Sequence, residues 1–304
     1  MYHDDMTATT PAPTSTTTRP PATARAVPTR RISFEDSLQQ LPKHFAGEGD
    51  LIASHLVAVL SALFPDGEDF FVRSVRNFRD RIDDPALQRD VAGFIGQEAV
   101  HGREHRVLND RLAELGYPTK RIERSVRFGL RVRDRLASPI ANLAATAALE
   151  HYTATLAEVL LSDEEVRDQL GTPELRDVFL WHALEECEHK AVAFDVFRAA
   201  GGSERTRTLQ MNLVTVSFIW AVSFNVVLSL LGDRETYRRG RLRASIGRMR
   251  TSSLFTKDVW RRLRDYNRPG FHPDDHDTEA LLARWREELF GAEGRLNHML
   301  AGAA

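Results

Sequence analysis

The sequence predicts an all-α protein, a four-helix bundle with a long crossover connection and additional C-terminal helices. Apolar residues recur at helical spacing over most of the chain, the continuous alternation typical of strands is absent, and Gly and Pro fall between the periodic segments. With 304 residues, of which 42% are hydrophobic and 28% charged, the chain is long enough to bury a sizeable core.

We expect three regions along the chain. Residues 1–33 are rich in Thr, Pro and Ala and carry no apolar period, which is typical of a disordered tail. Residues 34–204 contain the motifs described below and are expected to form the bundle. Residues 205–304 are expected to add an apolar helix, a basic stretch and C-terminal helices packed on that bundle.

Breaks in the apolar pattern predict where the helices begin and end. A first helix over 50–63 is expected to stop at Pro65 and to continue over 67–82 after a kink. Ser138 and Thr172 are each followed by proline, which is typical of a helix start. The remaining helices are expected at 85–115, 120–136, 138–161, 173–199 and 205–231, with two or three short ones over 234–300.

Charge and cysteine content exclude several classes of protein. Lys plus Arg number 41 against 43 Asp plus Glu, so a chain of net charge −2 is not a polycation built for nucleic acid. Residues 234–264 differ, with a local net charge of +9. Because Cys187 is the single cysteine, neither an internal disulfide nor a thiolate metal cage can form, which fits a reducing, cytoplasmic setting. We expect no secretory signal, since the N-terminus has no apolar core.

Two of the expected helices contain the motif Glu-x-x-His. The first motif runs from Glu98 to His101 and the second from Glu186 to His189. Residues i and i+3 lie about 60° apart around a helix, so each pair projects from one face. A single motif of this kind is ordinarily a solvated charged face, but two copies in matching settings indicate a shared site.

A lone glutamate precedes each motif at hairpin distance. Glu68 lies 30 residues before Glu98, and Glu150 lies 36 residues before Glu186, so each spacing leaves room for two helical arms and a turn. Four carboxylates cannot be buried together unpaired, because each uncompensated charge costs several kcal/mol. Two divalent cations cancel the four charges, and this ligand order is typical of ferritin-like di-iron and di-manganese bundles. We therefore predict a ferritin-like bundle that holds two metal ions.

Other side chains lie near the predicted metal-binding face. His182 and His105 each lie one helical turn from a motif residue, so either can bind a metal or support a ligand. Glu185 competes with its neighbour in the second motif for a ligand position. Cys187 and Tyr152 point away from the glutamates of their helices, so we expect a core position for the first and no redox role for the second.

Five stretches of the chain carry a family resemblance. They read FPDGEDFFVRSVRNFRD, GFIGQEAVHGREHRVLN, LEHYTATLAE, FLWHALEECEHKAVAFDVF and RPGFHP. These stretches resemble a bacterial family described as predicted metal-dependent hydrolases, over roughly residues 45–275. The resemblance implies a metal-dependent protein and, through its description, hydrolysis.

The order of the candidate ligands also resembles the p-aminobenzoate N-oxygenases, which are ferritin-like di-iron enzymes. Their ligands run Glu, Glu-x-x-His, Glu and then His-x-x-x-Glu-x-x-His, and the extra histidine implies that His182 is a ligand here. Only the site carries this resemblance, so no substrate is transferred. The matching residues, which we take as candidate metal-binding and catalytic residues, are Glu68, Glu98, His101, Glu150, His182, Glu186 and His189.

Three functions fit these residues. Nitrogen and oxygen ligands suit iron and manganese, so the first hypothesis is an enzyme with two Fe ions (or Mn, or mixed Fe/Mn). It would activate O2, with an external electron donor, to oxidise or oxygenate a small organic substrate. The second is a dinuclear metal-dependent hydrolase, for which Zn would serve. The third is a non-catalytic iron-binding or peroxide-detoxifying protein.

Residues 208–231 form an uncharged run of 24 residues, long enough to span a membrane. If it spanned a membrane, the positive-inside rule would place the basic stretch that follows it in the cytoplasm and the metal site outside the cell. That topology would need a secretory signal before the metal site, and none is expected. Polar side chains also interrupt the run. We therefore favour a buried or interfacial helix, which serves a homodimer or lines an apolar substrate tunnel. Because the +9 stretch can meet anionic lipid, peripheral membrane contact through 208–264 stays open.

Overall fold

The computed structural model describes residues 27–301, and this part of the chain is all-α, as predicted. It contains no strand within those bounds, and an isolated β-bridge joins Ile32 to Leu300. The α-helices are α1 (Leu51–Arg76), α2 (Pro85–Glu114), α3 (Thr119–Leu136), α4 (Pro139–Ser162), α5 (Glu164–Gln169), α6 (Pro173–His189), α7 (Val192–Ala199), α8 (Glu204–Leu231), α9 (Arg241–Thr251), α10 (Lys257–Asp265) and α11 (Glu279–Phe290).

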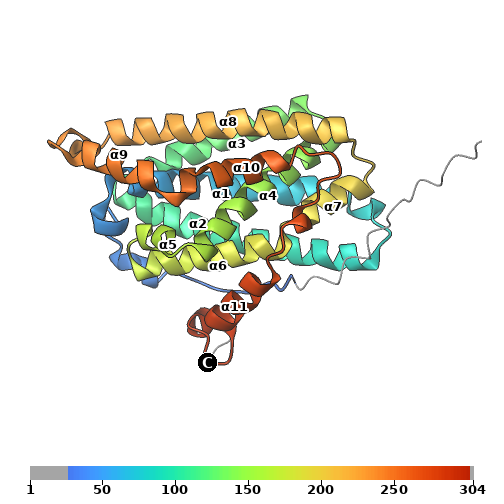
Figure 1. Cartoon of the computed structure of the whole chain (residues 1–304), viewed down its shortest axis with the longest axis horizontal. Coiled ribbons are helices and arrows are strands. Elements are labelled where there is room, and N and C mark those ends of the chain that lie inside the picture. Colours follow the sequence, from blue (N-terminus) through green and yellow to red (C-terminus); the bar gives the residue numbers. More distant parts are fainter. Residues whose placement is uncertain (1–26, 302–304) are drawn as a thin grey trace, which may run out of the picture.

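Two helix pairs form the centre of the molecule. α1 packs against α2 and α4 packs against α6, while α1 also contacts α4 and α2 also contacts α6. α3 carries the chain from the first pair to the second and packs on α1. These helices run along the long axis of the molecule, with α8 lying parallel to that axis at its top in Figure 1.

Besides a small cluster of Val59, Ala62 and Ile122 between α1 and α3, two large apolar clusters fill the bundle. One contains Trp181 and extends to α11, and the other contains Phe94 and extends to α7, α8 and α10. Trp181 lies against His101 and Phe94 lies against His189, with ring centroids 4.9 and 5.0 Å apart. The polar residues at the middle of the bundle are therefore enclosed by packed aromatic rings.

α1 runs through Pro65 without ending, so the predicted break between 50–63 and 67–82 is wrong. Proline has no N–H, and the carbonyl of Ser61, four residues earlier, therefore loses its helical partner. Asn109 of α2 donates from Nδ2 to that carbonyl oxygen at 3.1 Å. The neighbouring helix compensates for the proline, and α1 continues to Arg76.

The single helix predicted over 173–199 is two helices. α6 ends at His189, and α7 begins at Val192 after a short turn. Lys190 in this turn donates from Nζ to the carbonyl of His276 and to the hydroxyl of Thr278. The turn is thus tied to the C-terminal segment, and it leaves the last predicted ligand at the end of α6.

The last residues of the N-terminal tail predicted over 1–33 are ordered. Residues 1–26 lie outside the described residues, whereas residues 27–33 run along the bundle with defined contacts. Ile32 is 1% exposed, and Arg30 forms ion pairs with Glu185 and Glu188 of α6. The segment is held by partners that lie more than 150 residues away, so its local composition gives no sign of order.

α8 lies along the bundle with one side on α4 and α1 and its other side exposed. Within residues 27–301, two stretches are long and apolar enough to cross a membrane, Leu51–Arg81 and Glu204–Leu231, although a core helix passes the same test. The most apolar window of the first is 61% buried, whereas that of the second is 17% buried. The interpretation of α8 as a buried helix is therefore wrong, and its interfacial interpretation stays a prediction.

Candidate metal centre

Four glutamates from four helices converge in the middle of the bundle. Glu68 comes from α1, Glu98 from α2, Glu150 from α4 and Glu186 from α6. All four are buried, with at most 3% of any of them exposed. Position 102 is glycine on the α2 face next to Glu68, where an added Cβ would lie 3.2 Å from the Oε2 atom of that glutamate.

His189 lies beside three of these carboxylates. Its Nε2 atom is 3.1 Å from Glu98 Oε1, 3.3 Å from Glu150 Oε2 and 3.6 Å from Glu186 Oε2. An imidazole surrounded by carboxylates is a donor set for a divalent transition metal. These residues form one half of the candidate centre.

His101 and His182 lie on the other side of Glu186. Nδ1 of His101 is 3.7 Å from Glu186 Oε1, while Nε2 of His182 is 2.8 Å from the same oxygen and 3.9 Å from Glu68 Oε1. The two rings stack with their centroids 4.1 Å apart. These residues form the second half of the centre.

Two of the glutamates belong to both halves. Donor atoms of Glu98, Glu68 and His101 lie within 4.8 Å of one another. Donor atoms of Glu98, Glu186 and His189 also lie within that distance of one another. Glu186 also groups with the two stacked histidines within that distance. The seven predicted residues therefore form two adjoining donor sets that share carboxylates.

Except for Nε2 of His182 and Oε1 of Glu186, which lie 2.8 Å apart, the donor atoms have no hydrogen-bond partner within the described part of the chain. An unpartnered buried polar atom costs about 1–3 kcal/mol, so a fold that keeps many of them face to face fits bound cations. The residues therefore fit two divalent metal ions. The buried atoms without a partner include both carboxylate oxygens of Glu68, Glu98 and Glu150, one oxygen of Glu186, Nδ1 of His101 and Nε2 of His189.

A glutamine determines which nitrogen of His189 faces the centre. Gln97 donates from Nε2 to Glu188 Oε2 at 2.9 Å and to the carbonyl of Pro28 at 3.1 Å, so its Oε1 atom is an acceptor. His189 Nδ1 lies 2.9 Å from that oxygen and carries the ring proton. Its Nε2 atom is left with a lone pair directed at the carboxylates, the form that binds a metal.

Glu185 determines which nitrogen of His101 faces the centre. His101 donates from Nε2 to Glu185 Oε2 at 2.9 Å, and Arg30 donates to Glu185 Oε1 at 2.9 Å. Nδ1 of His101 is therefore unprotonated and faces the centre. Glu185, which competed for a ligand position on sequence grounds, contacts the candidate ligand His101 rather than the four glutamates.

A chain of side chains fixes His182. Asn109 donates from Nδ2 to the carbonyl of Ser61 and to Glu123 Oε1, so its Oδ1 atom accepts the Ser61 hydroxyl proton at 2.8 Å. Ser61 Oγ then accepts from Nδ1 of His105 at 2.9 Å, and Nε2 of His105 accepts from Nδ1 of His182 at 2.6 Å. Nε2 of His182 therefore carries a lone pair, and it faces a lone pair of the Glu186 carboxylate. Because two lone pairs repel each other, this contact requires a cation or a proton between the two atoms.

Three of the four carboxylates resist ionisation when no cation is present, whereas for Glu186 the nearby His189 and His182 outweigh burial and lower the pKa. Burial raises the pKa of Glu98 to about 8 and that of Glu150 to about 7, and it raises the pKa of Glu68 above its usual range. Burial lowers the pKa of His101, whereas for His189 the nearby carboxylates outweigh burial and raise the pKa. Two bound cations would remove this conflict, because they compensate the charges.

Two residues lie away from the centre, as predicted. Cys187 is buried in the core beside the carbonyl of Ala154, and burial raises the pKa of its thiol. The hydroxyl of Tyr152 donates to Thr215 of α8 at 2.8 Å. Neither side chain offers a ligand or redox group to the four glutamates.

Sequence reasoning missed the residues that orient the histidines. Gln97 directly precedes Glu98, and Asn109 lies one turn after His105, so a buried polar residue next to a motif was the available signal. Arg30 had no such signal, since it reaches Glu185 from a distant segment.

An apolar cavity of about 520 Å³ reaches the centre. Its wall includes His182 and Glu186, and most of the remainder is aliphatic or aromatic side chains of α1, α4, α8 and the α9–α10 region. Phe64 closes the inner end, with its ring centroid 4.7 Å from that of His182. The volume lies within the ~300–1,000 Å³ typical of small-molecule sites.

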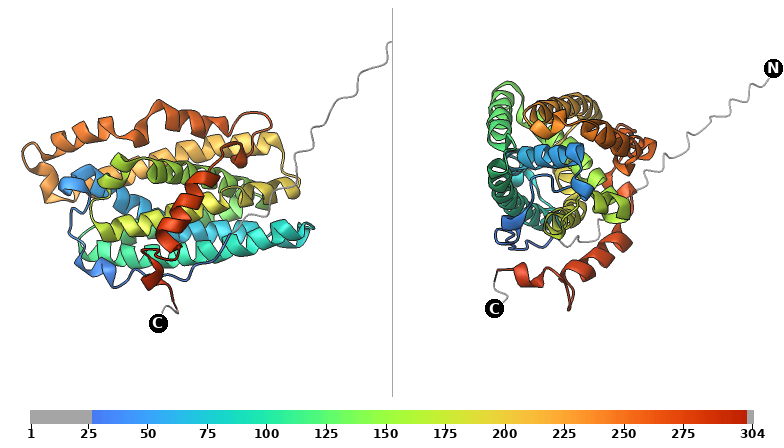
Figure 2. Two further views of the ribbon diagram at one scale, coloured as in Figure 1. Left: turned by 60° about the horizontal axis from the view of Figure 1, so that its bottom comes forward. Right: turned by 90° about the vertical axis from the view of Figure 1, so that its left-hand side faces the viewer.

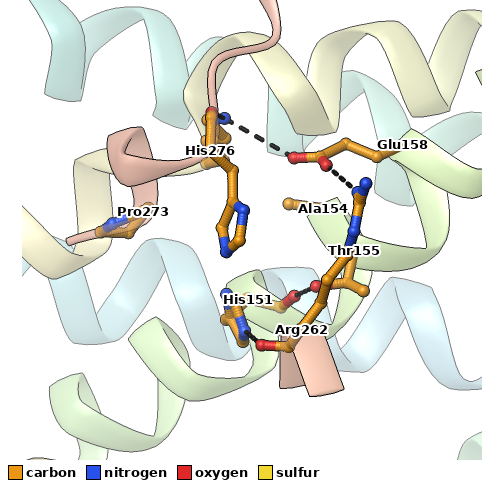
Figure 3. A pocket seen from close by; sticks show the side chains of 8 residues that line it. His151, Ala154, Thr155, Glu158, Arg262, Pro273 and His276 are labelled. Atoms are coloured by element: carbon orange, nitrogen blue, oxygen red, sulfur yellow. Dashed lines mark hydrogen bonds and ion pairs between the residues drawn. The ribbon is translucent and has the colours of Figure 1, made fainter. Parts of the chain in front are cut away.

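A second cavity of about 10 Å³ is separate from the centre (Figure 3). Arg262 of α10 donates to Glu158 at 2.6 Å across it, and His151 donates to the Arg262 carbonyl at 3.0 Å. The space suits about one water molecule. These contacts attach the C-terminal segment to α4 and add no donor to the metal centre.

Comparison with known proteins identifies one family. A family model described as predicted metal-dependent hydrolase matches residues 28–277, a range that contains all seven candidate ligands. No curated protein and no solved structure matches the chain. The resemblance of the ligand order to the p-aminobenzoate N-oxygenases stays a prediction.

Proposed function

The chain belongs to the family of predicted metal-dependent hydrolases, and from that premise we propose that it is a dinuclear metal enzyme that hydrolyses a bond in an apolar small molecule. The observation that carries the proposal is the set of buried carboxylate and imidazole atoms that face one another without hydrogen-bond partners. The family match supports metal dependence and favours hydrolysis over other reactions.

The chain's own residues have defined tasks in this proposal. Bound divalent cations would supply Lewis acidity and lower the pKa of a water molecule. Gln97 and Glu185 hold protons on the outer nitrogens of His189 and His101, which keeps the inner nitrogens available. The apolar wall of the cavity excludes water and holds the apolar part of the substrate beside His182.

The donor set favours a second candidate, an enzyme that activates O2 with two Fe ions. Four carboxylates and three imidazoles without a thiolate suit iron or manganese, and hard oxygen donors stabilise the oxidised metal. The seven residues keep the same positions in this candidate. It differs in requiring O2 and an external electron donor.

Loading metal-free protein with Zn, Mn or Fe(II) tests the two candidates. Turnover of esters or amides by the Zn or Mn form in air-free buffer supports the hydrolase. O2 uptake by the Fe(II) form that depends on Glu150 and His189 supports the second candidate. Glu104→Gln is the matched control, because Glu104 is buried on the same helix as Glu98 but accepts the backbone N–H of Phe34.

Two other outcomes are informative. Iron binding without turnover of esters, amides, amines, fatty acids, aromatic acids or peroxide assigns a non-catalytic iron-binding role. Folded protein that binds no metal contradicts all three functions.

A further inference from the structure

The outward side of α8 forms a continuous apolar strip. Side chains that recur every three or four residues make up this strip, and each is at least 44% exposed. The rings of Trp220 and Phe224 stack on it with centroids 5.0 Å apart. A contiguous apolar surface of this kind marks an interaction site. The strip consists of Leu209, Leu213, Val216, Trp220, Phe224 and Val227.

α3 and the α9–α10 region flank the strip on its two sides (Figure 2, right). Arg133 of α3 donates to Gln210 of α8 at 2.7 Å, and the α9–α10 region lines the apolar cavity together with α8. α3 carries a net charge of +5 and residues 234–264 carry +9, although the whole chain carries −2. Exposed arginines without an ion pair among the described residues include Arg121, Arg124, Arg131, Arg239, Arg243 and Arg250.

The apolar cavity opens at this same surface. Met249, Phe255, Trp260 and Ile219 line it and are between 36% and 49% exposed, so they form its mouth. Its inner end lies at the candidate metal centre. An apolar molecule that enters beside α8 therefore reaches the centre without crossing a polar surface.

We propose that the strip and its arginine flanks dock the protein on the surface of an anionic lipid bilayer, with the cavity mouth at the membrane. The apolar strip enters the boundary between headgroups and acyl chains, and the arginines contact lipid phosphates on both sides. This proposal goes beyond the proposed function, because it requires no bound metal.

α8 lies flat in this arrangement rather than spanning the bilayer. Its inner side is joined to the bundle near the middle of the helix and near its C-terminal end, through Tyr152 with Thr215 at 2.8 Å and His55 with Ser229 at 2.6 Å. A second copy of the chain is a poor occupant of the strip. A two-fold interface would bring the same cationic flanks together, and their repulsion opposes it.

Vesicle flotation of the full chain tests the proposal. We expect the protein to float with vesicles of phosphatidylcholine and phosphatidylglycerol in equal parts, and to bind far more weakly to phosphatidylcholine alone. High salt should weaken the binding, because it screens the arginines. Tryptophan emission should shift to the blue, since Trp220 and Trp260 are exposed whereas Trp181 and Trp285 are buried.

Variants separate the two parts of the surface. Trp220→Asp with Val227→Asp should weaken vesicle binding by about tenfold or more, since charge is placed in the apolar strip. Arg239→Glu with Arg243→Glu should weaken it by at least about fivefold for each arginine. Ala280→Asp with Ala283→Asp adds the same charge to exposed positions of α11, at the bottom of Figure 1, and should leave binding unchanged.

Three results would overturn the proposal. The first is failure of the folded chain to bind anionic vesicles, and the second is unaltered vesicle binding by the Trp220→Asp/Val227→Asp variant. The third is a parent chain that binds no vesicles and forms a dimer, when the same variant is a monomer. Light scattering and circular dichroism of each variant establish its oligomeric state and its folding.

Discussion

His105 and His182 contact each other, but their nitrogens have different surroundings. His182 presents an unprotonated Nε2 atom to Glu186 and Glu68, whereas His105 has both nitrogens engaged by His182 and Ser61. His182 is therefore placed to bind a metal, and His105 is placed to orient His182.

His182→Ala should leave the fold intact, weaken one of the two metal sites and change the optical spectrum of the bound metal. His105→Phe leaves the Nδ1 proton of His182 without an acceptor, so we expect about 10–100-fold weaker binding at that site, as for other orienting partners. Metal titration followed by absorbance measures both effects. Unchanged occupancy and spectrum in His182→Ala would show that this histidine only lines the cavity.

Glu98 and Glu186 differ from the other glutamates because they lie in both halves of the centre. We predict two metal ions per chain, with Glu98→Ala and Glu186→Ala each losing at least one of them. Elemental analysis of protein reconstituted under mild conditions measures the ratio. Glu104→Gln should retain two ions, and a ratio near zero in folded parent protein would contradict the dinuclear centre.

Among the elements, α1 depends on α2 at the position of its proline. Asn109→Ala removes the donor to the Ser61 carbonyl and to Glu123, so we expect a loss of about 1–3 kcal/mol in the free energy of unfolding. Urea denaturation of the metal-free protein measures it. Pro65→Ala restores an N–H to the Ser61 carbonyl, so Asn109→Ala should cost less in that background. An equal cost in both backgrounds would rule out this compensation.

The helices that bear the ligands could be predicted from apolar period and motif spacing, because both are local properties. The continuation of α1 through Pro65 could not, since the compensating donor lies 48 residues away in α2. The order of residues 27–33 depends in the same way on Glu185 and Glu188. Six candidate ligands follow from the repeated motifs with their preceding glutamates, and His182 follows from the resemblance in ligand order. The partners that orient their nitrogens follow only from packing.

For the molecule as a whole, charge and apolar surface are divided between two sides. The acidic residues at the centre are enclosed by α1, α2, α4 and α6, and the cationic stretches lie around α8 on the outside. The cavity connects these two regions. The bundle thus combines a buried site for cations with an exposed surface suited to anions, and the stability of the bundle should depend on whether the buried site is filled.

Removal of the metal should lower the free energy of unfolding, and the loss should grow as pH rises from about 6.5 to about 8. In the metal-free fold, burial raises the pKa of Glu98 to about 8 and that of Glu150 to about 7, against an ordinary value of 4.5. The folded state therefore binds more protons than the unfolded state in this window, and stability falls with rising pH by up to about 1.4 kcal/mol per unit for each proton.

Two buried histidines set the lower limit of this pH window. Below about pH 6.5 the buried His101 and His105, whose pKa values burial lowers, have the opposite effect, because the unfolded state takes up protons there. In the loaded protein the cations replace the protons on the glutamates, so its stability should change less with pH. Urea denaturation of metal-free and loaded protein across the window provides the comparison, and Glu98→Gln should flatten the metal-free curve because it removes a titrating carboxyl. If the metal-free protein instead became more stable as pH rose through this window, the glutamates would be ionised in the empty fold, and the physical reason for placing two cations among them would be lost.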